Sequence, residues 1–200
     1  MTEAANPELI DRLLGVIEND IAPLTSEAVK EGNKVFGAAI LRKDDLSLVL
    51  AATNNETANP LWHGEMHALK LLYEMAPEDR PAPADCIFLA THEPCSLCLS
   101  AITWGGYDNF HFLFSHEDSR DSFAIPHDLR ILKEVFTLDA GGYNSENAYW
   151  SSSNIKHAIR ACDPETRAGF EARVAALEEK YAAMSDVYQA NKTDTEIPLK

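Results

Sequence analysis

Residues 86–100 read CIFLATHEPCSLCLS, and they contain the change from strand to helix on which the fold depends. Cys86 to Thr91 is a short apolar run, which is typical of a strand buried in a parallel sheet. Pro94 follows at a position where a helix can begin, because the missing N–H of proline costs nothing in the first turn. Gly105 and Gly106 are suited to end that helix as a C-cap.

Strands and helices alternate on both sides of this unit. Lys43, Asp44 and Asp45 supply turn residues between two apolar stretches, which predicts a hairpin. Apolar residues at helical spacing predict helices before the hairpin and after it. The alternation predicts an α/β fold, namely a three-layer α/β/α sandwich with a mixed central sheet of about five strands. The expected helices cover residues 7–31 and 62–75, and the expected further strands cover residues 35–42, 46–53 and 110–115.

The chain is expected to divide into two parts that fold together. Residues 1–150 would form the catalytic domain with its N-terminal helix. Residues 151–200 would form a C-terminal helical extension that packs on the same domain. Its main element is a long charged amphipathic helix from about Pro164 to Ala190, which is expected to be a solvated face or part of a dimer contact.

Composition limits the classes of partner. The 200 residues are 46% hydrophobic, which is enough for a core without disulfides. The formal net charge is −15, with 17 basic and 32 acidic residues, so the mean field repels nucleic acid and anionic membranes. The N-terminal residues have no signal-peptide pattern, and the longest uncharged stretch is too short to span a bilayer. We therefore expect a soluble, cytoplasmic protein. The long amphipathic C-terminal helix favours a homodimer, because symmetric dimers are the commonest oligomers.

Four residues near two helix starts are candidates for chemistry: His63, Glu65, Cys95 and Cys98. The two cysteines lie three residues apart, so on a helix their sulfurs share one face. Two thiolates and one imidazole suit Zn²⁺, and three protein ligands leave a fourth position open for water, which is the catalytic pattern. Zinc lowers the pKa of a bound water toward neutrality. Glu65 is the expected proton shuttle between that water, a ring nitrogen and a leaving amine.

Other interpretations of the same residues are open. A C-x-x-C pair also occurs in thioredoxin-like redox proteins, although the adjacent H-x-E pattern has no role in redox chemistry. The cysteines could belong to a structural zinc site that a distant fourth ligand closes. His63 could be a core histidine, with Glu65 on the surface of its helix.

His63-Gly64-Glu65 together with Pro94-Cys95-Ser96-Leu97-Cys98 resembles the signature of the zinc-dependent cytidine deaminase-like superfamily. Two further stretches, Thr91 to Cys95 and Ala101 to Trp104, resemble the guanine deaminase and tRNA adenosine deaminase branch. The resemblance covers about Val35 to Asp128. It implies the cytidine deaminase-like fold, zinc held by His63, Cys95 and Cys98, and Glu65 as the catalytic residue.

The resemblance also implies residues that bind the substrate. Phe36 and Ala38 lie in the stretch that matches a strand lining the pocket of this family, and Gly64 lies beside the histidine ligand. An asparagine after the second strand contacts the substrate in the family, so Asn55 is expected in that role, with Asn54 as the alternative. Trp104 is expected to offer aromatic surface. Trp150 lies where related enzymes bring a C-terminal segment over the pocket.

These inferences favour a zinc-dependent hydrolytic deaminase of a small aminated ring, a nucleobase or nucleoside. Guanine is favoured by the resemblance, and cytosine or cytidine come next. The alternatives are a tRNA adenosine deaminase, a nucleotide deaminase of the deoxycytidylate type, and a zinc-stabilised scaffold protein without activity. The −15 charge argues against a polynucleotide substrate, because each bound phosphate normally needs a Lys or Arg.

Overall fold

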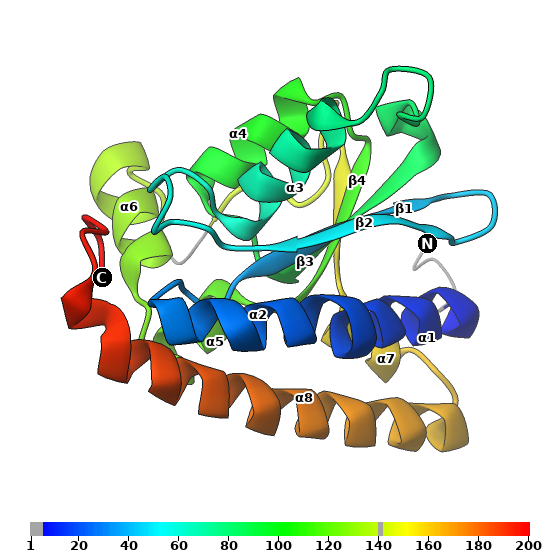
Figure 1. Ribbon diagram of the computed structural model, residues 1–200. Helices are drawn as coiled ribbons and strands as arrows, with labels where there is room; N and C mark the ends of the chain where they lie inside the picture. The colour runs from blue at the N-terminus through cyan, green and yellow to red at the C-terminus, as the bar shows by residue number, and fades with distance from the viewer. Residues whose placement is uncertain (1–5, 140–141) are drawn as a thin grey trace.

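The computed structural model describes residues 6–139 and 142–200. In this part of the chain a five-stranded sheet has the order β2-β1-β3-β4-β5, with helices on both faces (Figure 1). The strands are β1 (Gly37–Arg42), β2 (Leu48–Thr53), β3 (Cys86–His92), β4 (Asn109–Phe114) and β5 (Ser151–Asn154). The helices are α1 (Pro7–Val16), α2 (Ala22–Ala28), α3 (Gly64–Glu74), α4 (Ser96–Trp104), α5 (His116–Asp121), α6 (His127–Phe136), α7 (Ile155–Arg160) and α8 (Pro164–Asn191).

The sheet is mixed, as the sequence predicts. Strands β1 and β2 form an antiparallel hairpin, and β1 also pairs antiparallel with β3. Strands β4 and β5 then continue parallel to β3. All seven residues of β3 are buried, because this strand is central and covered on both faces. The mixed five-stranded sheet with flanking helices confirms the predicted α/β/α sandwich.

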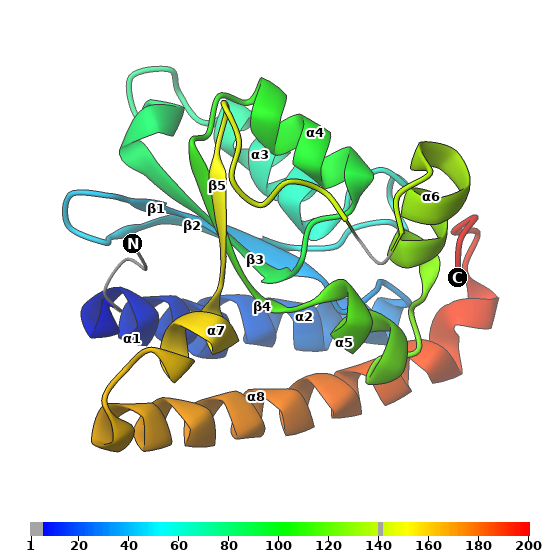
Figure 2. The same cartoon turned by 180° about the vertical axis from the view of Figure 1, so that it is seen from behind.

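One face of the sheet is covered by the N-terminal helices and by α8, which runs alongside them (Figures 1 and 2). The sequence predicts one helix over residues 7–31, and the structure has a π-helical turn, Ile17–Ile21, between α1 and α2. Pro23 lies in the first turn of α2 and has no N–H to donate to the carbonyl four residues earlier, which explains the local widening. Leu14, Ile17 and Tyr181 belong to the core on this face.

The opposite face is covered by α3 and α4 (Figure 2), the two helices that the sequence places after Pro60 and Pro94. A second apolar cluster joins them to the sheet through Leu72, Phe88 and Ile102. Helix α3 follows β2 and helix α4 follows β3. Both strands are antiparallel to β1, so they run in the same direction and the two helices begin at the same edge of the sheet. This common edge is what brings their first residues together.

The C-terminal part contributes more than helices. Strand β5 lies within residues 151–200 and forms an edge of the sheet, so the sheet crosses the boundary expected at residue 150. Its sequence, SSSN, lacks the β-branched and aromatic residues that mark a strand, which is why no pattern predicts it. Helix α8 agrees closely with the long helix expected over residues 164–190. Among the described helices, none combines the length and the apolar character that a membrane span requires.

His111 on β4 generates a testable dependence of stability on pH. Burial lowers its pKa to about 4, from an ordinary value of 6.5. The folded protein therefore holds the neutral form, and the unfolded chain gains a proton first as the pH falls below 6.5. We expect the free energy of unfolding to lose about 3 kcal/mol through this residue between pH 6.5 and pH 4. Urea unfolding of the His111→Gln protein across this range should show a correspondingly smaller loss.

The control is His157→Gln at an exposed position, which should keep the pH dependence of the wild type. If the His111→Gln protein loses stability with acid as steeply as the wild type, the buried imidazole is not the cause.

Candidate functional site

The candidate site lies where the first turns of α3 and α4 face each other at one edge of the sheet. His63 directly precedes α3, and Cys95 directly precedes α4, so both occupy the N-cap position. Cys98 is in the first turn of α4. The positive ends of the helix dipoles favour thiolates at such positions.

A close approach between backbone atoms places α3. A Cβ atom added to Gly64 would lie 2.7 Å from Cα of Gly37 in β1, a distance that real side chains do not tolerate. Gly64 therefore lets the first turn of α3 rest directly on the strand. Because Gly64 stands between His63 and Glu65, this contact fixes the positions of both neighbours.

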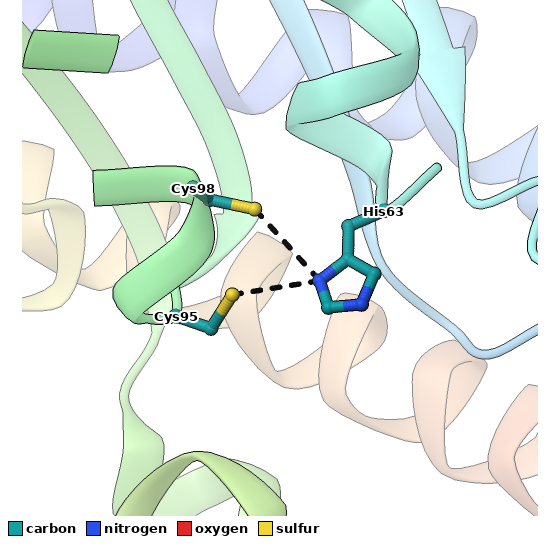
Figure 3. A group of neighbouring side chains, drawn as sticks. All are labelled: His63, Cys95 and Cys98. Atoms are coloured by element: carbon teal, nitrogen blue, oxygen red, sulfur yellow. Dashed lines mark hydrogen bonds between the residues drawn. The ribbon is translucent and has the colours of Figure 1, made fainter. Parts of the chain in front are cut away.

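His63, Cys95 and Cys98 meet as the sequence predicts (Figure 3). Nδ1 of His63 lies 3.4 Å from Sγ of Cys95 and 3.8 Å from Sγ of Cys98. The three ligand atoms lie within 4.8 Å of one another, and no other such group of His, Cys, Asp or Glu residues occurs in the described part of the chain. Two sulfurs and one imidazole nitrogen fit zinc, with a position left for a further ligand.

Glu65 is buried against this cluster, with a side chain that is 5% exposed. The thiol of Cys98 donates a hydrogen bond to its Oε2 at 3.3 Å. Burial, and then the nearby Cys95 thiolate, raise the pKa of Glu65 to about 7. A carboxyl group in this state can both take and give a proton near neutral pH.

Next to Glu65, the imidazole of His63 and the thiol of Cys95 shift each other's pKa. Hydrogen bonds from the Cys98 thiol and from His63 hold the pKa of Cys95 well below its ordinary value. Burial lowers the pKa of His63, but the Cys95 thiolate and the carboxylates of Glu56 and Glu65 outweigh it and raise the value to about 9. The site therefore concentrates negative charge around one imidazole, an arrangement that attracts a cation.

A cavity of about 290 Å³ opens beside His63 and Cys95. Its walls are mainly apolar, and one of them comes from the C-terminal residues of the chain. His127 holds this segment with a hydrogen bond of 3.1 Å between its Nε2 and the Lys200 carbonyl oxygen. The apolar lining residues are Phe36, Pro60, Leu61, Leu97, Ile125, Ile131, Ile197, Pro198 and Leu199.

Three charged residues of the cavity were not among the residues expected from the sequence. Lys34 and Glu56 are both buried and form an ion pair of 2.6 Å between Nζ and Oε1. Asp128 lines the cavity and also the small recess beside Glu65, and burial raises its pKa to about 6. No spacing pattern links these residues to the H-x-E and C-x-x-C motifs. The one feature of the sequence that could have pointed to them is a charged residue close to an apolar stretch.

Of the residues expected to bind substrate, Phe36 lines the cavity. Asn55 does not line it, and its backbone N–H donates to the Trp62 carbonyl at 2.8 Å. The side chain of Asn54 is already occupied, because its Oδ1 accepts from Gly64 N at 2.5 Å and its Nδ2 donates to Glu56 at 2.7 Å. Ala38 lies in the core with α3 and α4.

The two tryptophans that were expected to bind substrate, Trp104 and Trp150, do not line the cavity. Trp104 ends α4 on its outer side and is 90% exposed. Trp150 is buried against Phe110, and its Nε1 donates to Thr103 Oγ1 at 2.9 Å. A C-terminal segment does cover the cavity, but it consists of residues 197–199 rather than the stretch around Trp150.

Comparisons with known proteins agree with this geometry. Residues 20–114 match the family model described as the cytidine and deoxycytidylate deaminase zinc-binding region. A solved mutant of NE0047 in complex with 8-azaguanine is 19% identical, covers 94% of this chain and 86% of its own length, and has a TM-score of 0.52. This likeness shows the fold. No curated protein matched the sequence.

Two solved guanine deaminases are similar as well. The enzyme from Nitrosomonas europaea is 18% identical over 92% of this chain and 87% of its own, with a TM-score of 0.48. The enzyme from Bacillus subtilis is 25% identical over 64% of this chain and 82% of its own, with a TM-score of 0.45.

The cluster of His63, Cys95 and Cys98 predicts about one zinc ion per chain. We expect Cys95→Ala and Cys98→Ala proteins to lose most of this zinc in elemental analysis, because each removes one of three ligands. Cys162→Ala is the matched control, since Cys162 is also a buried free cysteine but belongs to the core cluster on the face covered by α1, α2 and α8. Full zinc content in either ligand variant would place the metal elsewhere.

Proposed function

We propose a reaction for this chain, whose residues 20–114 belong to the cytidine and deoxycytidylate deaminase zinc-binding family: the hydrolytic removal of the amino group from a small aminated nitrogen heterocycle. The observation that supports it most is the position of buried Glu65. Its carboxyl lies 3.3 Å from Sγ of Cys98 and lines a small recess that shares His63, Cys95 and Asp128 with the apolar cavity. A scaffold that used zinc only for stability would have no use for a buried acid there.

The roles follow from the positions. His63, Cys95 and Cys98 would hold zinc, which supplies an activated water as the nucleophile. Glu65 would take a proton from the water and deliver it to a ring nitrogen of the substrate, and would then take the second proton of the same oxygen and deliver it to the amino group, which leaves as ammonia. Its burial holds the carboxyl in one position and excludes bulk water from the proton transfers.

The cavity suits a small planar ring. Its volume of about 290 Å³ lies just below the range of about 300–1,000 Å³ that is usual for ligand pockets. Phe36 and the aliphatic walls provide surface for stacking and van der Waals contact. Among the described residues that line the cavity, Lys34 is the one with a lysine or arginine side chain. It is paired with Glu56. A free cation for a substrate phosphate is therefore missing from this lining, which disfavours a nucleotide.

Guanine is the free base that we favour. The stretches Thr91 to Cys95 and Ala101 to Trp104 resemble the guanine deaminase branch, and NE0047, which shares the fold, is known in complex with 8-azaguanine. Asp128 adds a chemical argument. A carboxylate accepts hydrogen bonds from two adjacent N–H groups, and guanine presents its N1–H and its 2-amino group along one edge.

Glu65→Gln should keep the zinc and lower kcat by about 10²–10⁴, because an amide preserves the shape but cannot transfer a proton. Glu74→Gln is the control, since Glu74 lies at the exposed end of the same helix. Ammonia release and elemental zinc would be measured on both proteins. A Glu65→Gln protein with nearly normal turnover would remove this residue from the mechanism.

The substrate class is tested by ammonia release from guanine, cytosine, cytidine, deoxycytidylate and a tRNA anticodon stem-loop at equal concentrations and low salt. We expect guanine to be turned over and the stem-loop to be inert, because a chain with a net charge of −15 repels a polyanion. Turnover of the stem-loop alone would overturn the small-substrate proposal. Turnover of cytosine or cytidine alone would replace guanine within it.

A further inference from the structure

We propose that Glu56 is a positioning residue for His63, and this inference rests on the zinc site of the proposed function. The ring of His63 has two nitrogens with different neighbours. Nδ1 faces the sulfurs of Cys95 and Cys98, whereas Nε2 points away from them (Figure 3). Nε2 lies 3.7 Å from Oε1 of Glu56. The buried carboxylate is therefore opposite the nitrogen that cannot ligate a metal at this site.

A histidine that ligates a metal through one ring nitrogen keeps a proton on the other. A carboxylate that accepts this proton fixes the tautomer and the orientation of the ring, and it increases the basicity of the ligating nitrogen. The distance of 3.7 Å is longer than a hydrogen bond. The last torsion of a histidine side chain is soft, so a small rotation of the ring brings Nε2–H into bonding range while Nδ1 keeps facing the sulfurs.

The carboxylate of Glu56 is itself held firmly. Its side chain is 2% exposed, and Lys34 donates to Oε1 at 2.6 Å. Asn54 donates to Oε2 at 2.7 Å and accepts from the backbone N–H of Gly64 at 2.5 Å. One amide thus connects the carboxylate to the first turn of α3, directly after His63. The metal ligand and its positioning residue are therefore fixed relative to the same helix start.

A competing explanation is that Glu56 serves only to neutralise the buried charge of Lys34. Removal of one partner of a buried ion pair leaves an uncompensated charge and destabilises a protein strongly. A single Glu56→Gln variant would therefore confound the two roles. The double variant Lys34→Met/Glu56→Gln removes both charges, so it cancels the cost of unpaired Lys34 but still lacks the carboxylate next to His63.

The double variant is informative because of the acceptor count at position 56. Glutamine has an oxygen at one end of its amide and an NH2 group at the other, whereas the two donors, Asn54 Nδ2 at Oε2 and His63 Nε2–H at Oε1, face different oxygens of the carboxylate. It can satisfy one of the two donors only. Lys34→Met leaves the carboxylate without its cationic partner but with Asn54 and His63 still facing it, so it serves as the control once its urea unfolding curve shows that it is folded.

The experiment measures zinc affinity by competition with a chelating dye on the wild type, the single Lys34→Met variant and the double variant. We expect the double variant to bind zinc about 10–100-fold more weakly than the wild type and Lys34→Met to stay close to the wild type. Cobalt substitution gives a second readout, because a reoriented imidazole changes the visible spectrum of bound Co²⁺ in the double variant.

The outcomes separate this inference from the proposed function. If the wild type binds zinc and the double variant binds it as tightly, with an unchanged cobalt spectrum, Glu56 does not position His63 and the inference is overturned. The same holds if Lys34→Met weakens zinc as much as the double variant, since the ion pair is then the cause. If the wild type binds no zinc, the proposed function fails first.

Discussion

The contact between Gly64 and Gly37 is the constraint on which the site depends. The first turn of α3 can rest on β1 only because no side chain lies between the two backbones. This contact sets the depth of α3 against the sheet, and the residues on either side of Gly64 are His63 and Glu65. A side chain at position 64 would push the helix away from the strand and would move the imidazole and the carboxyl together.

Burial determines the chemistry of the charged groups around that contact. Glu65 and Glu56 are buried, and Asp128 is half-buried in the wall of the cavity, so each carboxylate is favoured by a partner or a proton. Glu56 has Lys34 and Asn54, and burial raises the pKa of Glu65 and of Asp128. Burial thus shifts Glu65 and Asp128 toward their protonated forms, whereas Glu56 is paired.

The second helix start depends on a hydrogen-bonded loop between β3 and α4. Glu93 accepts from Tyr143 OH and from the backbone N–H of His116, and the Nε2 of His116 bonds the Pro94 carbonyl at 3.2 Å. These bonds connect the turn before Cys95 to the segment after β4. The position of the cysteine ligands therefore depends on residues that lie more than 20 positions further along the chain.

The sequence by itself determined the parts of this protein that local geometry controls. Helical spacing puts Cys95 and Cys98 on one face, and the strand between two helix starts brings His63 to them, so the metal cluster and the order of the main elements were predictable. The wall of the cavity was decided only by the tertiary structure, because Lys34, Glu56, Asp128 and residues 197–199 come from distant segments. The same is true of Trp104, whose aromatic character predicted a binding surface. Sequence spacing does not specify which side of α4 faces solvent. Trp104 lies on that side and is therefore exposed.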